Sequence, residues 1–313
     1  MPNPVITTRY GGEVTDNILV RTATGNELFE NGLINIKTGI KSGLAIPRLQ
    51  LSKLLQKRKA NPTSANSKGN LTIDERKLEP QDIMVYMEFN PARFEHFWKQ
   101  FQPTGEMVFQ ELPAEVQIKI LQAVLTQSAS ELGIEFLTGE KGDDEGQYFD
   151  GIITRILASD SVVKVECAQE SQIERLRKVW KGTDSVIREK PEFVFLTSKA
   201  DADAYDDEIT DLTAKGKSPT EKNPERFKGH RVVGLAGCPE GLIVGTLCSM
   251  DENKTNLFAA VNMVEDFNCI QVDKVSAASE LYFVKMLMKA DTQIAWDEAV
   301  TICDNRANAV VEG

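Results

Sequence analysis

The stretch that decides the fold is Pro113-Ala-Glu-Val-Gln-Ile-Lys-Ile-Leu-Gln-Ala-Val-Leu-Thr-Gln-Ser-Ala-Ser-Glu-Leu132. Its apolar residues recur every three or four positions, which predicts one long amphipathic helix. Pro113 suits the first turn of that helix, because a backbone N–H there has no partner within the helix. At ~1.5 Å per residue the helix would be roughly 28 Å long.

After the helix the sequence changes character. Gly139-Glu-Lys-Gly-Asp-Asp-Glu-Gly146 predicts an exposed acidic loop, and Phe149-Asp-Gly-Ile-Ile-Thr-Arg-Ile-Leu157 starts a new unit. Helices are expected near 169–181 and 202–212. Strands are expected at 162–167, 193–197, 232–235, 242–247, 255–261, 268–275, 281–289 and 292–302. Many short strands mixed with helices predict an α+β fold.

Before the helix the chain looks extended. Residues 1–45 are rich in Gly, Asn and Thr and show no helical stripe, so we expect an arm that buries its apolar groups on another surface. Apolar segments at 44–57 and 71–89 flank a loop of turn-forming residues at 59–70. Two apolar segments around such a loop predict a long projecting β-hairpin.

Composition places the chain among ordinary globular proteins. It has 313 residues, 41% of them hydrophobic and 27% charged, with a net charge of −11. No window approaches ~18 uninterrupted apolar residues, so no membrane span is expected. The sequence from Met1 lacks the regions of a secretory signal.

The charge is distributed unevenly along the chain. Ten basic and two acidic residues lie within 37–77, whereas four basic and thirteen acidic residues lie within 81–150. The basic segment of one copy can lie on the acidic face of another copy. Nucleic-acid contact and a merely solvated face are the alternatives. Nucleic-acid binding would need aromatic side chains for stacking, and 37–77 has none.

The residues available for chemistry are few. The five cysteines are odd in number and include no CxxC pair, which predicts reduced thiols instead of a disulfide framework or zinc finger; they are Cys167, Cys238, Cys248, Cys269 and Cys303. Only two histidines occur, His96 and His230, which limits acid–base and metal chemistry.

Two short motifs resemble parts of catalytic or binding sites. Asp201-Ala-Asp203 could hold a divalent cation, as in a metal-dependent glycosyltransferase, but it also fits an acidic helix start. Gly216-Lys217-Ser218 lacks the first Gly of a phosphate-binding loop, because residue 211 is Asp. We therefore predict no catalytic residue, no cofactor and no metal site, and a protein that is not an enzyme.

The order of elements resembles that of the major capsid proteins of tailed bacteriophages, which have the Hong-Kong-97-type fold. Phe136-Leu-Thr-Gly139 and Gln147-Tyr-Phe-Asp-Gly-Ile-Ile-Thr-Arg155 are similar to that family's passage from a long helix into a second domain. Three further stretches are similar to strands and turns of the family. They are Pro191-Glu-Phe-Val-Phe-Leu-Thr-Ser198, Gly229-His-Arg-Val-Val-Gly234 with Cys238-Pro-Glu-Gly241, and Phe283-Val-Lys-Met-Leu-Met-Lys-Ala-Asp-Thr-Gln-Ile-Ala-Trp296.

The resemblance implies an α+β chain in four parts. These are an N-terminal arm at 1–42, an extended β-hairpin called the E-loop at 43–89, a peripheral domain at 90–150 and 256–294, and an axial domain at 151–255 and 295–313. The spine helix of the peripheral domain would cover about 113–137.

The resemblance also implies a structural function. The chain would form hexamers and pentamers of an icosahedral shell that encloses double-stranded DNA without sequence-specific binding. It would work with separate scaffold and portal proteins, be assembled in the bacterial cytoplasm and reside in the virion, with no membrane partner. An encapsulin-like nanocompartment is the alternative within this fold. The candidate intersubunit residues are the basic residues of the loop: Arg48, Lys53, Lys57, Arg58, Lys59, Lys68, Arg76 and Lys77.

Two departures from the family pattern lead to expectations. Some relatives join a loop lysine to an asparagine after a Phe-Val-Lys strand, but here that position is Met286. We therefore expect no self-cross-linking. The sequence also begins close to the arm, so a scaffold segment would have been removed or would be a separate protein.

Overall fold

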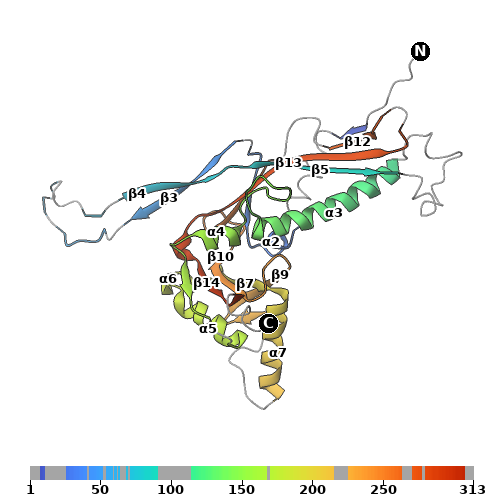
Figure 1. The fold of residues 1–313 in the computed structure, drawn as a ribbon. Coiled ribbons are helices and arrows are strands. Elements are labelled where there is room, and N and C mark those ends of the chain that lie inside the picture. Colours follow the sequence, from blue (N-terminus) through green and yellow to red (C-terminus); the bar gives the residue numbers. More distant parts are fainter. Residues whose placement is uncertain are drawn as a thin grey trace.

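The computed structural model describes residues 8–10, 26–40, 42–51, 54–58, 60–61, 63, 68–69, 71–90, 114–167, 170–214, 225–262, 270–276 and 279–306. Three sheets organise these residues: two of six strands and one of two strands. Figure 1 shows a long two-stranded hairpin extending away from a body made of an elongated upper part and a rounder lower part.

The elongated part is built on β13 (Tyr282–Ile294). Its sheet has the order β1-β12-β13-β11-β2, and β5 also pairs with β13. The pairing of β5 with β13 is antiparallel over nine residue pairs, from Tyr282 with Phe89 to Ala290 with Gln81. The other strands are β1 (Thr8–Tyr10), β2 (Asn35–Thr38), β5 (Gln81–Phe89), β11 (Leu257–Asn262) and β12 (Ile270–Lys274).

The long helix α3 (Ala114–Thr138) lies along this sheet (Figure 1). Leu121, Leu125 and Leu132 share one buried cluster with Val284 and Met286 of β13. The apolar stripe of the helix therefore covers one face of the sheet. The short helix α2 (Glu27–Glu30) begins at Asn26, whose side chain accepts a hydrogen bond from the Phe29 N–H.

The rounder part is a six-stranded sheet of order β6-β14-β10-β7-β9-β8. One face packs on α5 and α7 through Leu176, Phe195 and Tyr205, and the opposite face joins the cluster around α3 and α4. The strands are β6 (Val163–Val165), β7 (Phe193–Ser198), β8 (Arg226–Phe227), β9 (His230–Leu235), β10 (Leu242–Leu247) and β14 (Thr301–Asp304). The helices are α4 (Ile152–Ala158), α5 (Gln172–Gly182), α6 (Ser185–Arg188), α7 (Lys199–Ala214) and the 3₁₀ turn η4 (Asp297–Ala299).

The α+β architecture predicted from the sequence is confirmed, and α3 matches the expected helix at 113–137 within one residue at each end. The strand expected at 292–302 is wrong as a single element. Residues 292–294 complete β13, η4 follows, and β14 begins at Thr301. Among the described residues, no helix is long and apolar enough to span a membrane.

The expectation that every cysteine is a reduced thiol is also wrong. Cys167 and Cys303, 136 residues apart in sequence, are joined by a disulfide bond. Cys238 and Cys248 are free and buried, whereas Cys269 and His96 lie outside the described residues.

Candidate intersubunit surface

The projecting hairpin consists of β3 (Leu44–Leu51) and β4 (Leu71–Leu78), paired antiparallel in a sheet of their own. Residues directly opposite each other in such a pair lie on the same face. Leu49 pairs with Ile73, and Leu71 lies two residues before Ile73 on the same face. These three side chains are exposed by 56%, 68% and 53% respectively. The hairpin thus carries an exposed apolar face, defined here by Leu49, Leu71 and Ile73.

The opposite face of the hairpin is used inside the chain, near the root. Ile46 and Leu78 are buried against Phe258, Ala260 and Ala295. Leu78 is fully buried, while Ile73, five residues earlier, is two-thirds exposed. The same strands are therefore anchored in the body at one end and uncovered at the other.

Two of the predicted basic residues anchor the root. Arg48 donates to the Ala295 carbonyl at 3.0 Å, pairs with Asp74 and lies 5.0 Å from the ring centre of Trp296. Arg76 donates to the buried Asp297 carboxylate at 2.6 Å. Both arginines hold the hairpin to its own chain, so their charge is neutralised within the subunit.

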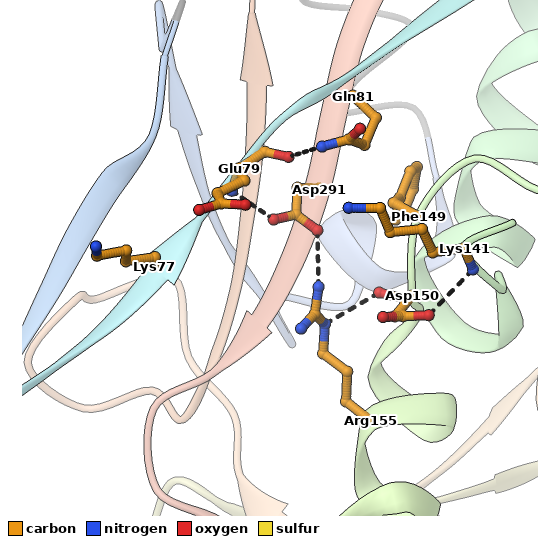
Figure 2. Close-up of a pocket in the computed structure, with 8 residues that line it drawn as sticks. All are labelled: Lys77, Glu79, Gln81, Lys141, Phe149, Asp150, Arg155 and Asp291. Carbon is orange, nitrogen blue, oxygen red and sulfur yellow. Dashed lines mark hydrogen bonds and ion pairs between the residues drawn. The ribbon is translucent and has the colours of Figure 1, made fainter.

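A polar pocket lies where the hairpin joins the body (Figure 2). The buried Asp291 carboxylate accepts hydrogen bonds from the Glu79 backbone N–H at 2.7 Å and from Arg155 at 3.0 Å. Arg155 also donates to the Asp150 carbonyl at 3.2 Å. Burial raises the pKa of the Asp291 carboxyl, although Glu79 and Arg155 oppose that shift. These contacts tie the hairpin, β13, α4 and the end of the α3 loop into one joint.

The other predicted residues fall into two groups. Lys57, Arg58, Lys68 and Lys77 are exposed, and of these only Lys77 has an acidic partner among the described residues, Glu75 at 3.8 Å. Lys53 and Lys59 lie outside the described residues. Lys57, Arg58 and Lys68 lie between β3 and β4, toward the tip, whereas Lys77 lies at the root beside Leu78.

The charge pattern of the sequence does not reveal the apolar face of the hairpin. A signal for it is present in the sequence, because Leu49 and Leu51 alternate with polar residues, as do Leu71 and Ile73. Period-two alternation places such residues on one face of a strand. Local sequence could not show which face the body would leave uncovered.

The outer face of the β5–β13 ribbon is a second uncovered surface. Met84 pairs with Leu287, and the Tyr86 ring stacks on Phe283 with 5.8 Å between ring centres. Met84, Tyr86 and Leu287 are exposed by 55%, 48% and 42%. Together with Phe283 they form the apolar stripe of the ribbon. The nearby loop after α3 exposes four carboxylates, Glu140, Asp143, Asp144 and Glu145.

Asp201 and Asp203 are placed as parts of a helix start. Asp201 donates its N–H to the Ser198 hydroxyl, and its carboxylate accepts from Ser198 and Gly241 at 2.8 Å each and from Arg175 at 3.2 Å. The Ser198 hydroxyl thus caps the first turn of α7, and the Asp201 carboxylate is fully engaged within the chain. Asp203 is exposed on the next turn. No group of three or more potential metal ligands occurs among the residues that the structure describes.

Met286, at the position of the relatives' cross-link acceptor, is 1% exposed and belongs to the core beneath α3. Its side chain therefore points away from the outer face of the ribbon.

The described residues thus combine a projecting hairpin, a long helix along a β-ribbon and an α/β lobe. No family model and no curated protein matches the sequence. Solved structures match nearly the whole chain. A chain of the satellite phage P4 procapsid matches with a TM-score of 0.64 at 11% identity, over 97% of this chain and 93% of that one.

Two further solved structures share the fold. The capsid of Myoviridae phage XM1 matches with a TM-score of 0.57 at 10% identity, covering 97% of this chain and 96% of that one. The encapsulin complex from Synechococcus elongatus matches with a TM-score of 0.50 at 12% identity, covering 91% and 89%. The chain has the fold of tailed-phage major capsid proteins, as the resemblance in its sequence implied.

Proposed function

We propose that this protein is a major capsid protein that self-assembles into hexamers and pentamers of an icosahedral head shell. The observation that carries the proposal is the apolar face of the hairpin, which is uncovered on a chain with a capsid fold. A fold alone does not define function. An anchored hairpin with three exposed apolar side chains at its far end requires a covering surface, and another copy of the chain supplies one.

The proposed division of the chain follows the resemblance. Residues 1–42 form the arm, 43–89 the E-loop, 90–150 with 256–294 the peripheral domain, and 151–255 with 295–313 the axial domain. The two six-stranded sheets support the split between the peripheral and axial domains, while β2 of the arm and β5 of the E-loop add strands to the peripheral sheet.

In the interface we propose, apolar contacts make the main contribution and charged contacts a secondary one. The apolar face of the hairpin of one copy covers apolar surface of its neighbour, for which the stripe around Met84 and Tyr86 is the best match. Lys57, Arg58 and Lys68 then approach acidic groups such as those of the loop at 140–145. Exposed ion pairs contribute little each, but together they influence register and association rate.

The proposed setting is the virion. The shell encloses double-stranded DNA without reading its sequence, is assembled in the bacterial cytoplasm, and uses separate scaffold and portal proteins. The net charge of −11 supports this, because an acidic protein does not bind DNA phosphates tightly.

Electron microscopy of the purified chain over a range of concentration and salt tests the proposal. Shells, tubes or rings are expected, with slower assembly at high salt because the charged contacts are screened. A chain that stays monomeric at high concentration, both alone and with the proteins encoded beside it, would contradict the proposal.

The similarity to an encapsulin supports a second candidate function, that of an encapsulin-like compartment. The two functions differ in contents. Particles recovered from the producing cells hold DNA in the first case, and protein cargo without DNA in the second.

A further inference from the structure

The disulfide between Cys167 and Cys303 lies at an edge of the lower sheet. The edge strand β6 pairs with β14 over only three residues, Val163 to Val165 opposite Thr301 to Cys303. Cys167 follows β6 directly, and its Cα lies 5.8 Å from that of Cys303. The bond thus fastens the chain between β6 and α5 to β14, the last strand that the structure describes.

The fastened region is the seam between sheet and helix. The end of α5 sits so close that a Cβ on Gly182 would lie 2.6 Å from Val165 Cγ1. The Thr183 hydroxyl donates to the Thr301 hydroxyl at 2.9 Å. With only a three-residue pairing, β6 has little hydrogen bonding of its own to hold it. The covalent bond makes opening of this edge much less favourable.

The surroundings suit both oxidation states. Cys167 is 7% exposed and Cys303 is fully buried, in a cluster with Leu176 and Val179. Two thiols would fit there as small apolar groups. The two sulfurs are also shielded, so an external thiolate reaches the bond only when the edge opens.

The pairing is selective. Burial raises the pKa of the Cys238 thiol and of the Cys248 thiol to about 12 in each case. Neither is present as a thiolate near neutral pH, and the thiolate is the form that attacks a disulfide. Exchange of the bond with these two thiols is therefore slow.

We propose that Cys167 and Cys303 form a redox-controlled staple of the lower lobe, open as two thiols in a reducing cytoplasm and closed under oxidising conditions outside the cell. The two environments follow from the proposed function; the chemistry does not depend on it. A low-molecular-weight disulfide serves as the oxidant. When the edge opens and exposes both thiols, Cys167 loses its proton to solvent and its thiolate attacks the small disulfide, which releases one thiolate. Cys303 then loses its proton, and its thiolate attacks the Cys167 sulfur of the mixed disulfide and releases a second thiolate; the two released thiolates take up two protons from solvent. Two protein thiols are oxidised, and one small disulfide is reduced to two thiols.

The test compares the dithiol and disulfide forms of one preparation. The full chain is reduced with dithiothreitol, and half is then oxidised with oxidised glutathione. Peptide mapping should find Cys167 linked to Cys303 only in the oxidised half. Closing a loop of this length should raise the melting temperature by on the order of 10 °C. Dithiothreitol should reverse the bond slowly in the folded chain and quickly in urea.

Matched variants assign the effect. In Cys303→Ser the redox-dependent difference in melting temperature should disappear, whereas Cys238→Ser, another buried thiol, should keep it. If Cys303→Ser does not fold, the comparison between the dithiol and disulfide forms of the wild-type chain tests the proposal by itself. A different pairing, or equal melting temperatures of the two forms, overturns the proposal. Both readouts use subunits, so failure to form shells would bear on the proposed function and leave this result unaffected.

Discussion

Ile73 offers a direct measurement of what the hairpin contributes to assembly. Its side chain is 68% exposed in the subunit, on the apolar face of the hairpin. Full burial of an Ile side chain is worth ~1.5–3 kcal/mol, so covering the exposed two-thirds yields ~1–2 kcal/mol per contact. A ring of six such contacts would gain ~6–12 kcal/mol on the same estimate.

The substitution Ile73→Thr keeps a β-branched side chain, and with it most of the preference for a strand. The subunit should therefore melt within about 1 °C of wild type, since an exposed site contributes little to folding. Each contact between subunits should weaken roughly tenfold, because 1.4 kcal/mol corresponds to a factor of ten. Light scattering against concentration reports assembly, and circular dichroism reports melting.

Val186→Thr is the matched control. Val186 is 71% exposed, on α6 and away from the hairpin, and its change to Thr likewise replaces an exposed apolar group by a hydroxyl, with a somewhat smaller loss of apolar surface. Its assembly curve should follow wild type. If Ile73→Thr assembles like Val186→Thr, the apolar face of the hairpin does not carry the interface. If it lowers subunit melting as much as assembly, the face is part of the subunit core.

Four further outcomes are expected. Arg76→Ala should lower the free energy of unfolding in urea by ~1–2 kcal/mol, because Asp297 then loses its charged partner; no change would refute the anchor. Burial raises the pKa of Asp291, so the folded chain binds this proton more tightly than the unfolded chain does. The stabilisation from this bound proton is complete below the unfolded pKa of Asp291 and is lost as pH rises through its folded pKa. The wild-type chain should therefore lose stability relative to Asp291→Asn as pH rises over that acidic range. The opposite slope would refute the assignment. Assembled Lys57→Ala should run like wild type on denaturing gels, since a lost slow band would reveal a cross-link. Mn²⁺ should leave the melting temperature of wild type and Asp203→Ala unchanged, and stabilisation of wild type alone would restore the metal hypothesis.

The elements that sequence predicted well are those whose signal is local. The helix over 114–132 follows from apolar spacing within its own residues, whereas its continuation to Thr138 was expected only from the family resemblance. Likewise, β7 and β10 are short apolar runs in which every residue is buried.

The end of β13 shows why other bounds failed. The run Asp291-Thr-Gln293 is polar and looks like the end of a strand, yet it is buried. Each side chain has a distant polar partner: Arg155 for Asp291, the Asp150 carbonyl for Thr292, and the Lys77 carbonyl for Gln293. Partners more than a hundred residues away leave no trace in local periodicity.

The candidate surface was predicted only in part, for a similar reason. The sequence identified the hairpin and its charge, but Arg48 and Arg76 find partners beyond residue 290. These contacts of Arg48 and Arg76, and the pairing of Cys167 with Cys303, depend on the tertiary fold, which brings distant segments of the chain together.

The joint between hairpin and body has a mechanical consequence. Only Glu79 and Pro80 separate β4 from β5, and the Glu79 N–H and the Lys77 carbonyl are both held by β13. Eight strand residues span ~26 Å, so a rotation of ~10° at this joint would swing the far end by ~5 Å. The hairpin would rotate as a rigid unit about these few hydrogen bonds, which form the pivot. In a closed shell, the local curvature that each copy accepts would be set at that pivot, far from the surface where the copies touch.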